Sequence, residues 1–221
     1  MFILKHMQNT DHSNIQWAHS PDYPFHQAES HLRRRDALIG ALIDRYGPCQ
    51  LGRQSASHYH NLVHTVIEQQ LSVAVAKCIA GRLLQAQGGD CFEPVRLSRV
   101  AEERQRACGL SHAKIRCIRA LTEAVLVGEL DFALLQRSSD TEVLRLLTRF
   151  PGIGPWTAQI FLMFSLHRLD VLPIGDLALR NAMKQCYRLS AKPTMAEYIA
   201  VAQAWRPYRS IASWYLWASI D

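Results

Sequence analysis

The 221-residue sequence lacks three features: a Cys-x-x-Cys pair, an apolar run long enough to cross a bilayer, and the alternation of apolar and polar residues typical of strands. The six cysteines therefore do not have the spacing of a zinc ribbon or an iron–sulfur protein, and we expect buried free thiols in a reducing compartment. Lys5 and His6 interrupt the short apolar start, so the sequence predicts neither a signal peptide nor a transmembrane helix. These absences predict an intracellular protein that does not contact a membrane.

The pattern that is present is helical. With 48% hydrophobic and 20% charged residues, the chain has enough apolar side chains for a sizeable core. Apolar residues recur at helical spacing over most of its length. The predicted helices cover residues 32–46, 60–87, 114–127, 141–148, 155–166, 176–187, 195–204 and 208–220. Residues 1–30 show no periodicity and predict an extended arm, so the expected fold class is all-α with short connections.

The charge balance points to an anionic partner. The formal net charge is +6, which favours such a partner without identifying it. Seven Lys or Arg residues lie from Arg96 to Arg119, against only Glu102 and Glu103. This basic segment fits a surface that faces a polyanion, and it fits a solvated helix face equally well.

Residues 150–158 read Phe-Pro-Gly-Ile-Gly-Pro-Trp-Thr-Ala and connect two predicted helices. Gly152 and Gly154 can adopt the backbone angles of a sharp reversal, and Pro155 suits the first turn of the second helix. Such a turn exposes backbone N–H groups beside the positive N-terminal end of a helix, an arrangement that can hold a phosphate. An ordinary helix–helix turn gives the same pattern, and on the turn alone the two interpretations are balanced. A capping-box sequence at residues 139–142 predicts the start of the first helix.

Asp176 lies twenty residues after Trp156, in the segment Leu-Pro-Ile-Gly-Asp-Leu. It stands at the predicted start of a helix, where an aspartate cap stabilises the first turn by about 1 kcal/mol. A carboxylate can also oppose a developing positive charge or orient a water molecule for attack. The two roles are compatible, and the hairpin upstream favours the second.

His58, His60 and His64 share one edge of a predicted helix and are candidate metal ligands. No cysteine or carboxylate near them has convincing zinc geometry, so exposed histidines are the favoured interpretation. We therefore expect no zinc at this edge.

Two motifs taken together resemble the helix-hairpin-helix (HhH-GPD) DNA glycosylases that have a catalytic aspartate downstream of the hairpin. They are Leu-Thr-Arg-Phe-Pro-Gly-Ile-Gly-Pro-Trp-Thr-Ala-Gln at residues 147–159 and Leu-Pro-Ile-Gly-Asp-Leu-Ala-Leu-Arg at residues 172–180. Within this superfamily the chain is most similar to the 3-methyladenine DNA glycosylase II branch. Three further segments resemble that branch, at residues 67–72, 108–114 and 205–212.

The resemblance implies a two-lobed helical fold with a DNA-binding cleft between the lobes and the helix-hairpin-helix motif in one of them. One lobe would span residues 58–170, and the other would combine residues 31–57 with 171–221. The arm at residues 1–30 is too short for the N-terminal β-rich domain of some relatives, so the chain resembles the compact form.

The resemblance also implies an enzyme that excises alkylated purines, of the 3-methyladenine and 7-methylguanine type, from duplex DNA. Asp176 would be the catalytic carboxylate, acting on a nucleotide flipped out of the helix. Bifunctional relatives have a lysine at the position of Trp156, and its amine attacks the sugar, so we expect a monofunctional glycosylase without AP-lyase activity. The partner would be double-stranded DNA containing alkylated bases, bound by a monomer that is DNA-associated in the bacterial nucleoid and cytoplasm or in the eukaryotic nucleus.

The same resemblance assigns residues to the base pocket and the wedge. Trp156 and Trp217 align with pocket tryptophans, whose rings would favour a cationic alkylated purine by about 0.5 to 2 kcal/mol. Ile160 stands in this pocket where well-known relatives have a tyrosine. Gln70 is the predicted wedge that fills the gap left by the flipped nucleotide, and Leu71 is the weaker candidate.

In the hairpin, the resemblance predicts contacts of Gly152, Ile153, Gly154 and Thr157 with a DNA phosphate. Backbone carbonyls of Phe150, Gly152 and Ile153 would hold a structural, non-catalytic Na⁺ or K⁺ that bridges to the phosphate. No cofactor is required for the predicted reaction.

The chain departs from the pattern of the branch at several positions. Glu68 stands where a glycine is usual, and Gly175 replaces a frequent second aspartate, which leaves Asp176 as the single carboxylate of its segment. Together with Ile160, these departures leave two alternatives open. One is a non-catalytic helix-hairpin-helix protein that binds DNA shape or lesions, and the other is a glycosylase for deaminated or oxidised bases.

Overall fold

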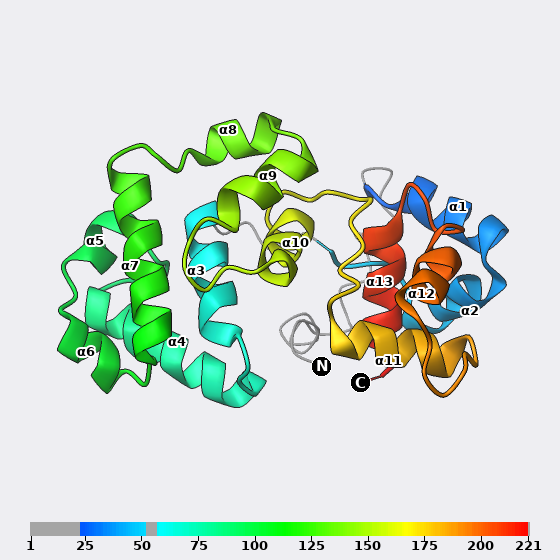
Figure 1. Cartoon of the computed structure of the whole chain (residues 1–221), viewed down its shortest axis with the longest axis horizontal. Helices are drawn as coiled ribbons and strands as arrows, with labels where there is room; N and C mark the ends of the chain where they lie inside the picture. The colour runs from blue at the N-terminus through cyan, green and yellow to red at the C-terminus, as the bar shows by residue number, and fades with distance from the viewer. Residues whose placement is uncertain (1–22, 52–56, 221) are drawn as a thin grey trace. The chain divides into compact units, whose positions relative to one another are not determined.

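The computed structural model describes residues 23–51 and 57–220, and these residues contain thirteen α-helices and no strand (Figure 1). The predicted all-α class is confirmed. The described residues divide into two compact units, of which the split unit comprises residues 23–51 and 167–220 and the continuous unit comprises residues 57–166. No helix in this part of the chain is long and apolar enough to cross a membrane.

The split unit is built around its last helix. It contains α1 (His26–Arg35), α2 (Ala37–Tyr46), α11 (Leu177–Cys186), α12 (Met195–Ala202) and α13 (Arg209–Ala218). α13 packs against α1, α2 and α11, and every side chain from Ser210 to Ala218 is buried. A helix covered on all sides forms the core of its unit, and here the core includes Tyr215 and Trp217.

Asp36 divides the single helix predicted for residues 32–46 into α1 and α2. Its Oδ1 accepts two backbone N–H groups from the first turn of α2, at 3.0 and 3.1 Å. Its Oδ2 accepts the Tyr187 hydroxyl at 2.6 Å and the Trp205 indole N–H at 2.9 Å. The aspartate therefore caps the second helix and joins it to residues far along the chain, so the prediction of one continuous helix is wrong.

The structure also corrects the predicted arm at its C-terminal end. Residues 1–22 lie outside the described residues, but α1 begins at His26, inside the range expected to be extended. The buried carboxylate of Glu29 explains the difference, because its Oε1 accepts hydrogen bonds from the Tyr23 and Tyr215 hydroxyls and from the Cys49 backbone N–H. Burial, reinforced by the acidic neighbours, raises the pKa of both tyrosines, which remain neutral donors. The local sequence pattern does not reveal such distant partners.

The continuous unit is centred on its first helix. It contains α3 (His58–Glu68), α4 (Val73–Gln87), α5 (Pro94–Ser98), α6 (Glu102–Ala107), α7 (His112–Leu126), α8 (Phe132–Arg137), α9 (Asp140–Leu147) and α10 (Pro155–Phe164). α3 contacts α4, α7 and α10, and α7 also packs against α5 and α6. Ile67, Ile118 and Phe161 are almost completely buried in these contacts.

A break at residues 69–72 separates α3 from α4, where the sequence predicts one helix over residues 60–87. Gln70 has a φ of 57°, a left-handed conformation that cannot continue a right-handed helix. Ser72 then starts α4 by accepting the Val75 N–H at 3.4 Å. The prediction of a continuous helix over residues 60–87 is therefore wrong. The sequence does not reveal the break because apolar residues keep their helical spacing through it.

α9 begins at the predicted place, with half of the predicted capping box. Ser139 Oγ accepts the Glu142 N–H at 3.3 Å. The Glu142 carboxylate pairs instead with Arg145, at 2.7 Å, so it does not return to the cap. Thr194 and Glu197 make the complete reciprocal box at the start of α12.

Three short helices, α5, α6 and α8, have no counterpart among the predicted ones. They contain five or six residues each, too few to give a periodic apolar pattern. All six cysteines are free, but only Cys49, Cys108 and Cys117 are buried. The expectation of buried thiols therefore holds for half of them.

Candidate functional site

The Pro-Gly-Ile-Gly segment forms a tight turn between α9 and α10, within the continuous unit. Gly152 has a φ of 86°, a left-handed conformation that favours glycine. The Ile153 N–H bonds to the Phe150 carbonyl at 3.1 Å, and the buried Ile153 side chain anchors the turn. α10 then begins at Pro155 with Gly154 as its N-cap. The structure confirms the predicted turn and the helices on both sides of it.

The N-terminal end of α10 has no side-chain cap. Gly154 contributes no side-chain cap, and both Gly152 and Gly154 are exposed. The first N–H groups of a helix lack intrahelical partners and carry the positive end of the helix dipole, which suits a phosphate oxygen. Thr157 is different, because its hydroxyl is buried and accepts the Gln69 side-chain N–H at 3.0 Å. A phosphate contact by Thr157 would therefore use its backbone.

The two predicted wedge residues lie in the break between α3 and α4. Gln70 is exposed at the left-handed position, whereas Leu71 is half-buried and its N–H bonds to the Glu68 carbonyl at 3.2 Å. A non-glycine residue in this conformation costs about 1 to 3 kcal/mol and persists where its surroundings fix it, often at functional sites. The geometry favours Gln70 over Leu71 as the outward-reaching side chain, and its role in DNA stays a prediction.

Asp176, in the split unit, is both a helix cap and an oriented carboxylate. Its Oδ1 accepts the Leu179 N–H at 2.7 Å and the Trp217 indole N–H at 3.0 Å. Its own N–H bonds to the Pro173 carbonyl at 2.8 Å and closes the turn before α11. The side chain is half-buried. The structure therefore confirms the helix cap, whereas the catalytic role of the carboxylate stays a prediction.

Trp217 contacts the carboxylate, a role that sequence reasoning did not find. The tryptophan is 2% exposed, and it lies 41 residues after the aspartate that it binds. No motif spacing connects the two positions. A place for the Trp217 ring in the base pocket stays a prediction.

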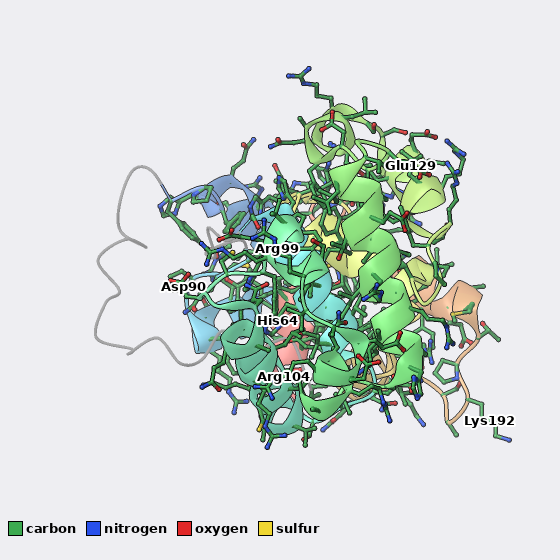
Figure 2. All side chains as sticks on the ribbon, turned by 90° about the vertical axis from the view of Figure 1, so that its left-hand side faces the viewer. His64, Asp90, Arg99, Arg104, Glu129 and Lys192 are labelled. Carbon is green, nitrogen blue, oxygen red and sulfur yellow. The ribbon has the colours of Figure 1, made fainter. Side chains whose placement is uncertain are left out.

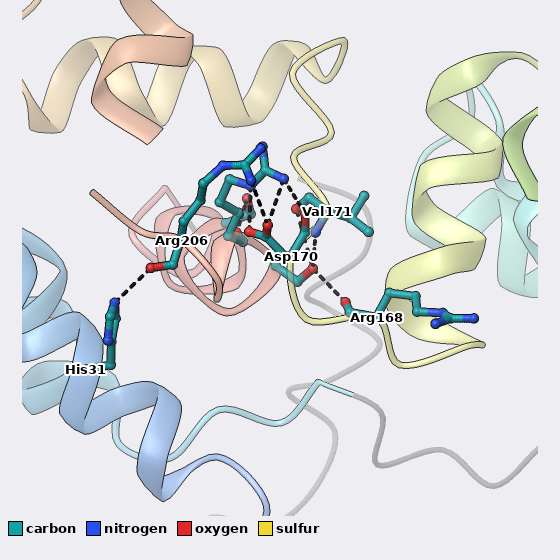
Figure 3. Close-up of polar contacts among 8 residues, drawn as sticks. His31, Arg168, Asp170, Val171 and Arg206 are labelled. Atoms are coloured by element: carbon teal, nitrogen blue, oxygen red, sulfur yellow. Dashed lines mark hydrogen bonds and ion pairs between the residues drawn. The ribbon is translucent and has the colours of Figure 1, made fainter. Parts of the chain in front are cut away.

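The segment that leads to Asp176 is tied to the start of α13 (Figure 3). Arg209 makes a bidentate ion pair with Asp170, with Nε–Oδ1 and Nη2–Oδ2 distances of 2.6 and 3.0 Å, and it also donates to the Asp170 carbonyl at 2.6 Å. Ser210 Oγ donates to the Arg168 carbonyl at 2.7 Å and accepts the Val171 N–H at 3.0 Å. Bidentate arginine–carboxylate pairs restrict geometry strongly, so the chain before the aspartate is held in place. Sequence analysis assigned no role to Arg209 or Asp170.

Trp156 and Ile160, the other predicted pocket residues, lie on α10 in the continuous unit. Trp156 is half-buried and Ile160 is 4% exposed. Asp176 and Trp217, in contrast, belong to the split unit. The pairing of the hairpin with the aspartate in one site stays a prediction.

Two of the carbonyls predicted to hold a monovalent cation already accept hydrogen bonds. The Phe150 carbonyl accepts the Ile153 N–H at 3.1 Å, and the Gly152 carbonyl accepts the Gln69 side-chain N–H at 3.0 Å. A carbonyl oxygen has two lone pairs, so these contacts are compatible with a cation at the turn. The cation stays a prediction.

The three histidines on α3 are half-buried and bonded to protein groups, so the expectation that they are exposed is wrong. His58 Nδ1 lies 2.9 Å from Ser165 Oγ, and His60 Nδ1 accepts the Phe92 N–H at 3.0 Å. Burial lowers the pKa of both histidines. Among the residues that the structure describes, no group of three or more His, Cys, Asp or Glu side chains is placed to hold a metal ion.

The arginines of the basic segment are exposed. Figure 2 labels Arg99 and Arg104, both of which are exposed on the continuous unit. Arg96 is partly neutralised by Glu93, with a distance of 2.9 Å. This exposure fits both a polyanion-facing surface and a solvated helix face, and the two interpretations stay open.

Comparisons with known proteins extend over both units. A model of the HhH-GPD superfamily base excision DNA repair proteins matches residues 63–207. The chain is 30% identical over 202 residues to the alkylbase DNA glycosidase-like protein mag2 of Schizosaccharomyces pombe, covering 90% of this chain and 95% of that protein. It is 32% identical over 195 residues to DNA-3-methyladenine glycosylase 1 of the same yeast, covering 86% of each.

Solved structures agree with these matches. The DNA-3-methyladenine glycosidase of Bacillus halodurans has a TM-score of 0.77 and 38% identity, covering 90% of both chains. The S. pombe 3-methyladenine DNA glycosylase in complex with abasic DNA has a TM-score of 0.79 and 32% identity, covering 87% of this chain and 96% of that one. The helical fold, the glycine hairpin and the downstream aspartate thus coincide with a family match over most of the chain. This protein belongs to the HhH-GPD superfamily of base excision DNA repair proteins.

Proposed function

We propose that this protein is a monofunctional DNA glycosylase that removes alkylated purines from duplex DNA. Membership of the HhH-GPD superfamily supports glycosylase chemistry. The names of the S. pombe and B. halodurans relatives support a substrate of the 3-methyladenine type. The observation that carries the proposal is the carboxylate of Asp176, whose Oδ1 is held by two N–H donors at 2.7 and 3.0 Å.

The proposed reaction hydrolyses the N-glycosidic bond of a flipped nucleotide. The bonding electron pair leaves with the base, and positive charge develops on the sugar. An N3- or N7-alkylated purine is already cationic, so it departs as a neutral base. Asp176 opposes the charge on the sugar and orients the water whose oxygen bonds to C1′ and whose proton passes to the carboxylate or to solvent. The products are a free base and an abasic site.

The surroundings of Asp176 suit this role because they fix the carboxylate before substrate binds. Two donors on one oxygen define its position, and the Arg209–Asp170 ion pair holds the chain that precedes it. Electrostatic groups that need no rearrangement during the reaction stabilise a transition state most effectively.

The absence of a nucleophilic amine at the hairpin supports monofunctional chemistry. Trp156 occupies the position where bifunctional relatives have a lysine, and an indole cannot form a Schiff base. Lys114 and Lys184 have their ammonium groups engaged with backbone carbonyls, at 2.6 to 2.7 Å. The proposed product therefore retains an intact sugar–phosphate chain.

The remaining predicted contacts complete the proposal. Duplex DNA is the partner of a monomeric enzyme, and its phosphate lies against the hairpin N–H groups, with a Na⁺ or K⁺ at the turn. Trp156 faces the cationic base, and Gln70 enters the gap that the flipped nucleotide leaves. The exposed glycines of the hairpin and the exposed left-handed Gln70 support these assignments.

Base-release profiling tests the proposed function. Duplexes containing 3-methyladenine, 7-methylguanine, 1,N6-ethenoadenine or hypoxanthine are incubated with the wild-type protein, and the free bases are quantified. We expect release of the two methylated purines. Release of hypoxanthine alone would favour the alternative of a deaminated-base glycosylase. Binding to these duplexes without release of any base would favour a non-catalytic lesion-binding protein.

A second experiment tests the monofunctional assignment. A duplex with a preformed abasic site is incubated with enzyme, and half of the reaction receives sodium borohydride, which traps Schiff bases. We expect no strand cleavage above the enzyme-free control and no covalent protein–DNA adduct. Either product would contradict the assignment while leaving glycosylase activity intact.

A further inference from the structure

Two segments of the continuous unit, the end of α3 and the first turn of α7, meet beside the hairpin. Lys114, in the first turn of α7, donates from Nζ to the carbonyls of Ile67 and Gln69, at 2.6 and 2.7 Å. Both carbonyls belong to the end of α3, where the last carbonyls lack helical partners. A cation at this end also interacts favourably with the helix dipole. Lys114 therefore holds the chain on both sides of the point where α3 stops.

The Gln69 side chain extends this contact to the hairpin. Its Nε2 donates to the Gly152 carbonyl and to Thr157 Oγ1, each at 3.0 Å. An amide nitrogen has two hydrogens, so these bonds use its full donor capacity. One partner lies at the tip of the hairpin and the other in the first turn of α10. The Gln69 side chain thus links the 69–72 break to the hairpin by two hydrogen bonds.

α7 packs directly against the hairpin, in addition to its indirect connection through Lys114 and Gln69. A Cβ placed on Gly152 would lie 3.4 Å from the Cys117 Cβ, so the turn rests closely on this helix. Lys114 and Cys117 are three residues apart and share one helix face. Burial raises the pKa of the Cys117 thiol to about 12, so it packs as a neutral group. One face of α7 therefore supports both the break and the turn.

The charges around Lys114 are consistent with a fixed position. Burial lowers the pKa of the half-buried Lys114, and the carboxylate of Glu68 opposes this effect. Glu68 is itself paired with His64, at 2.9 Å between Oε1 and Nδ1. The glutamate that departs from the usual glycine is therefore part of the electrostatic surroundings of the lysine.

We propose that Lys114 and Gln69 are positioning residues that join the 69–72 break to the hairpin, so that the proposed wedge and the proposed phosphate-binding turn engage DNA as one preorganised body. The inference rests on the proposed function for the DNA roles of those two loops. Neither loop has regular secondary structure to fix its position. Ordering them in the free protein lowers the conformational cost of binding.

Hydrogen–deuterium exchange of the whole protein tests the connection without DNA. Lys114→Met and Gln69→Met each remove the donors and keep an unbranched side chain. We expect exchange of the hairpin amides in residues 150–157 to accelerate about fivefold or more in both variants, although Lys114 itself donates to neither Gly152 nor Thr157. Peptides from α13 serve as the internal reference for global stability.

Two control variants match the chemical changes. Lys184→Met removes an ammonium that donates to the Ala191 carbonyl at 2.7 Å in the split unit. Gln85→Met removes an exposed amide from α4. We expect neither control to alter exchange in the hairpin. If the amides of residues 150–157 exchange in Lys114→Met and Gln69→Met at the same rate as in the two control variants, the inference is overturned.

DNA binding gives the second readout, with a tetrahydrofuran abasic-site duplex and an undamaged duplex as probes. We expect each variant to bind the abasic-site duplex about tenfold more weakly, and the double variant to bind little more weakly than either, because the two residues act through one connection. At saturating DNA, single-turnover base release should stay within about twofold of wild type, since preorganisation acts on binding. Additive losses in the double variant would contradict the inference.

The two proposals fail in different ways. If the wild-type protein releases no alkylated base, the proposed function fails, while accelerated hairpin exchange in Lys114→Met still supports the connection. If the wild-type protein releases the base and hairpin exchange is unchanged in both variants, the connection fails and the function stands. Rescue of hairpin protection by Lys114→Arg, which retains a donor and its charge, would support a positioning role over a loss of packing.

Discussion

Replacing Asp176 with asparagine separates the proposed catalytic role from the structural one. Asparagine keeps a side-chain oxygen that can accept the Leu179 and Trp217 N–H groups, which lie 2.7 and 3.0 Å from Oδ1. It also caps helices about as well as aspartate does, so we expect the unfolding free energy to change by less than about 0.5 kcal/mol. What the variant loses is the negative charge.

Replacing Asp176 with alanine removes both roles. The lost cap costs about 0.5 to 2 kcal/mol. The indole N–H of Trp217, a residue that is 2% exposed, would lose its acceptor, which costs about 1 to 3 kcal/mol more. We therefore expect Asp176→Ala to lower the unfolding free energy by about 1.5 to 5 kcal/mol in urea titrations followed by circular dichroism.

Catalysis should respond differently from stability. Both variants lack the charge that opposes the developing positive sugar, and removal of such a group lowers rates by about 10² to 10⁴. The assay is single-turnover release of 7-methylguanine from a duplex with enzyme in excess. Asp131→Asn is the matched control, because Asp131 caps α8 through bonds of 2.8 and 3.4 Å. That variant should retain the wild-type rate.

Two results would refute this reasoning. Base release by Asp176→Asn at the wild-type rate would show that the charge is dispensable. If Asp176→Asn were destabilised as much as Asp176→Ala, the asparagine oxygen would not be replacing the aspartate oxygen as acceptor. Loss of activity in Asp176→Asn could then result from a damaged fold. Only a stable, folded and inactive asparagine variant supports the proposed mechanism.

Three further predictions concern the hairpin and the surroundings of the aspartate. Gly152→Ala should weaken duplex binding severalfold in fluorescence anisotropy, because a φ of 86° is strained for alanine by about 1 kcal/mol or more; unchanged affinity would argue against the turn as the phosphate site. Trp217→Phe removes the N–H donor to Asp176 and should lower kcat, with a loss of about 1 to 3 kcal/mol in unfolding free energy; a normal kcat would exclude a role for this bond. Arg209→Lys cannot reproduce the bidentate pair with Asp170 and should lower kcat with little change in KM, and the reverse pattern would contradict a positioning role.

Much of the fold could be predicted because its signals are local. Gly152 and Gly154 provide the conformations of a sharp turn, and Pro155 marks the first turn of α10. Asp176 caps the helix that follows it, as its position before a helical pattern indicates. In each case the side chain acts on backbone groups within a few residues, so the sequence contains both partners side by side.

The contacts that fix the site could not be predicted, because their partners are distant in the chain. Trp217 reaches Asp176 across 41 residues, and Arg209 reaches Asp170 across 39. Neither separation forms part of a periodic pattern. The fold creates these pairs only after α13 has packed into the core of the split unit.

The break between α3 and α4 is a different kind of failure, because local signals there favour the wrong structure. Leu71 and Val75 continue the helical spacing of α3, yet Gln70 adopts a φ of 57° that ends it. The left-handed conformation is unfavourable for glutamine, so bonds from outside the segment must stabilise it. The two Lys114 bonds provide this stabilisation at the end of α3, one of them to the carbonyl of Gln69, the residue before Gln70. The apolar spacing of the segment contains no trace of these bonds, so the sequence alone could not show where α3 ends.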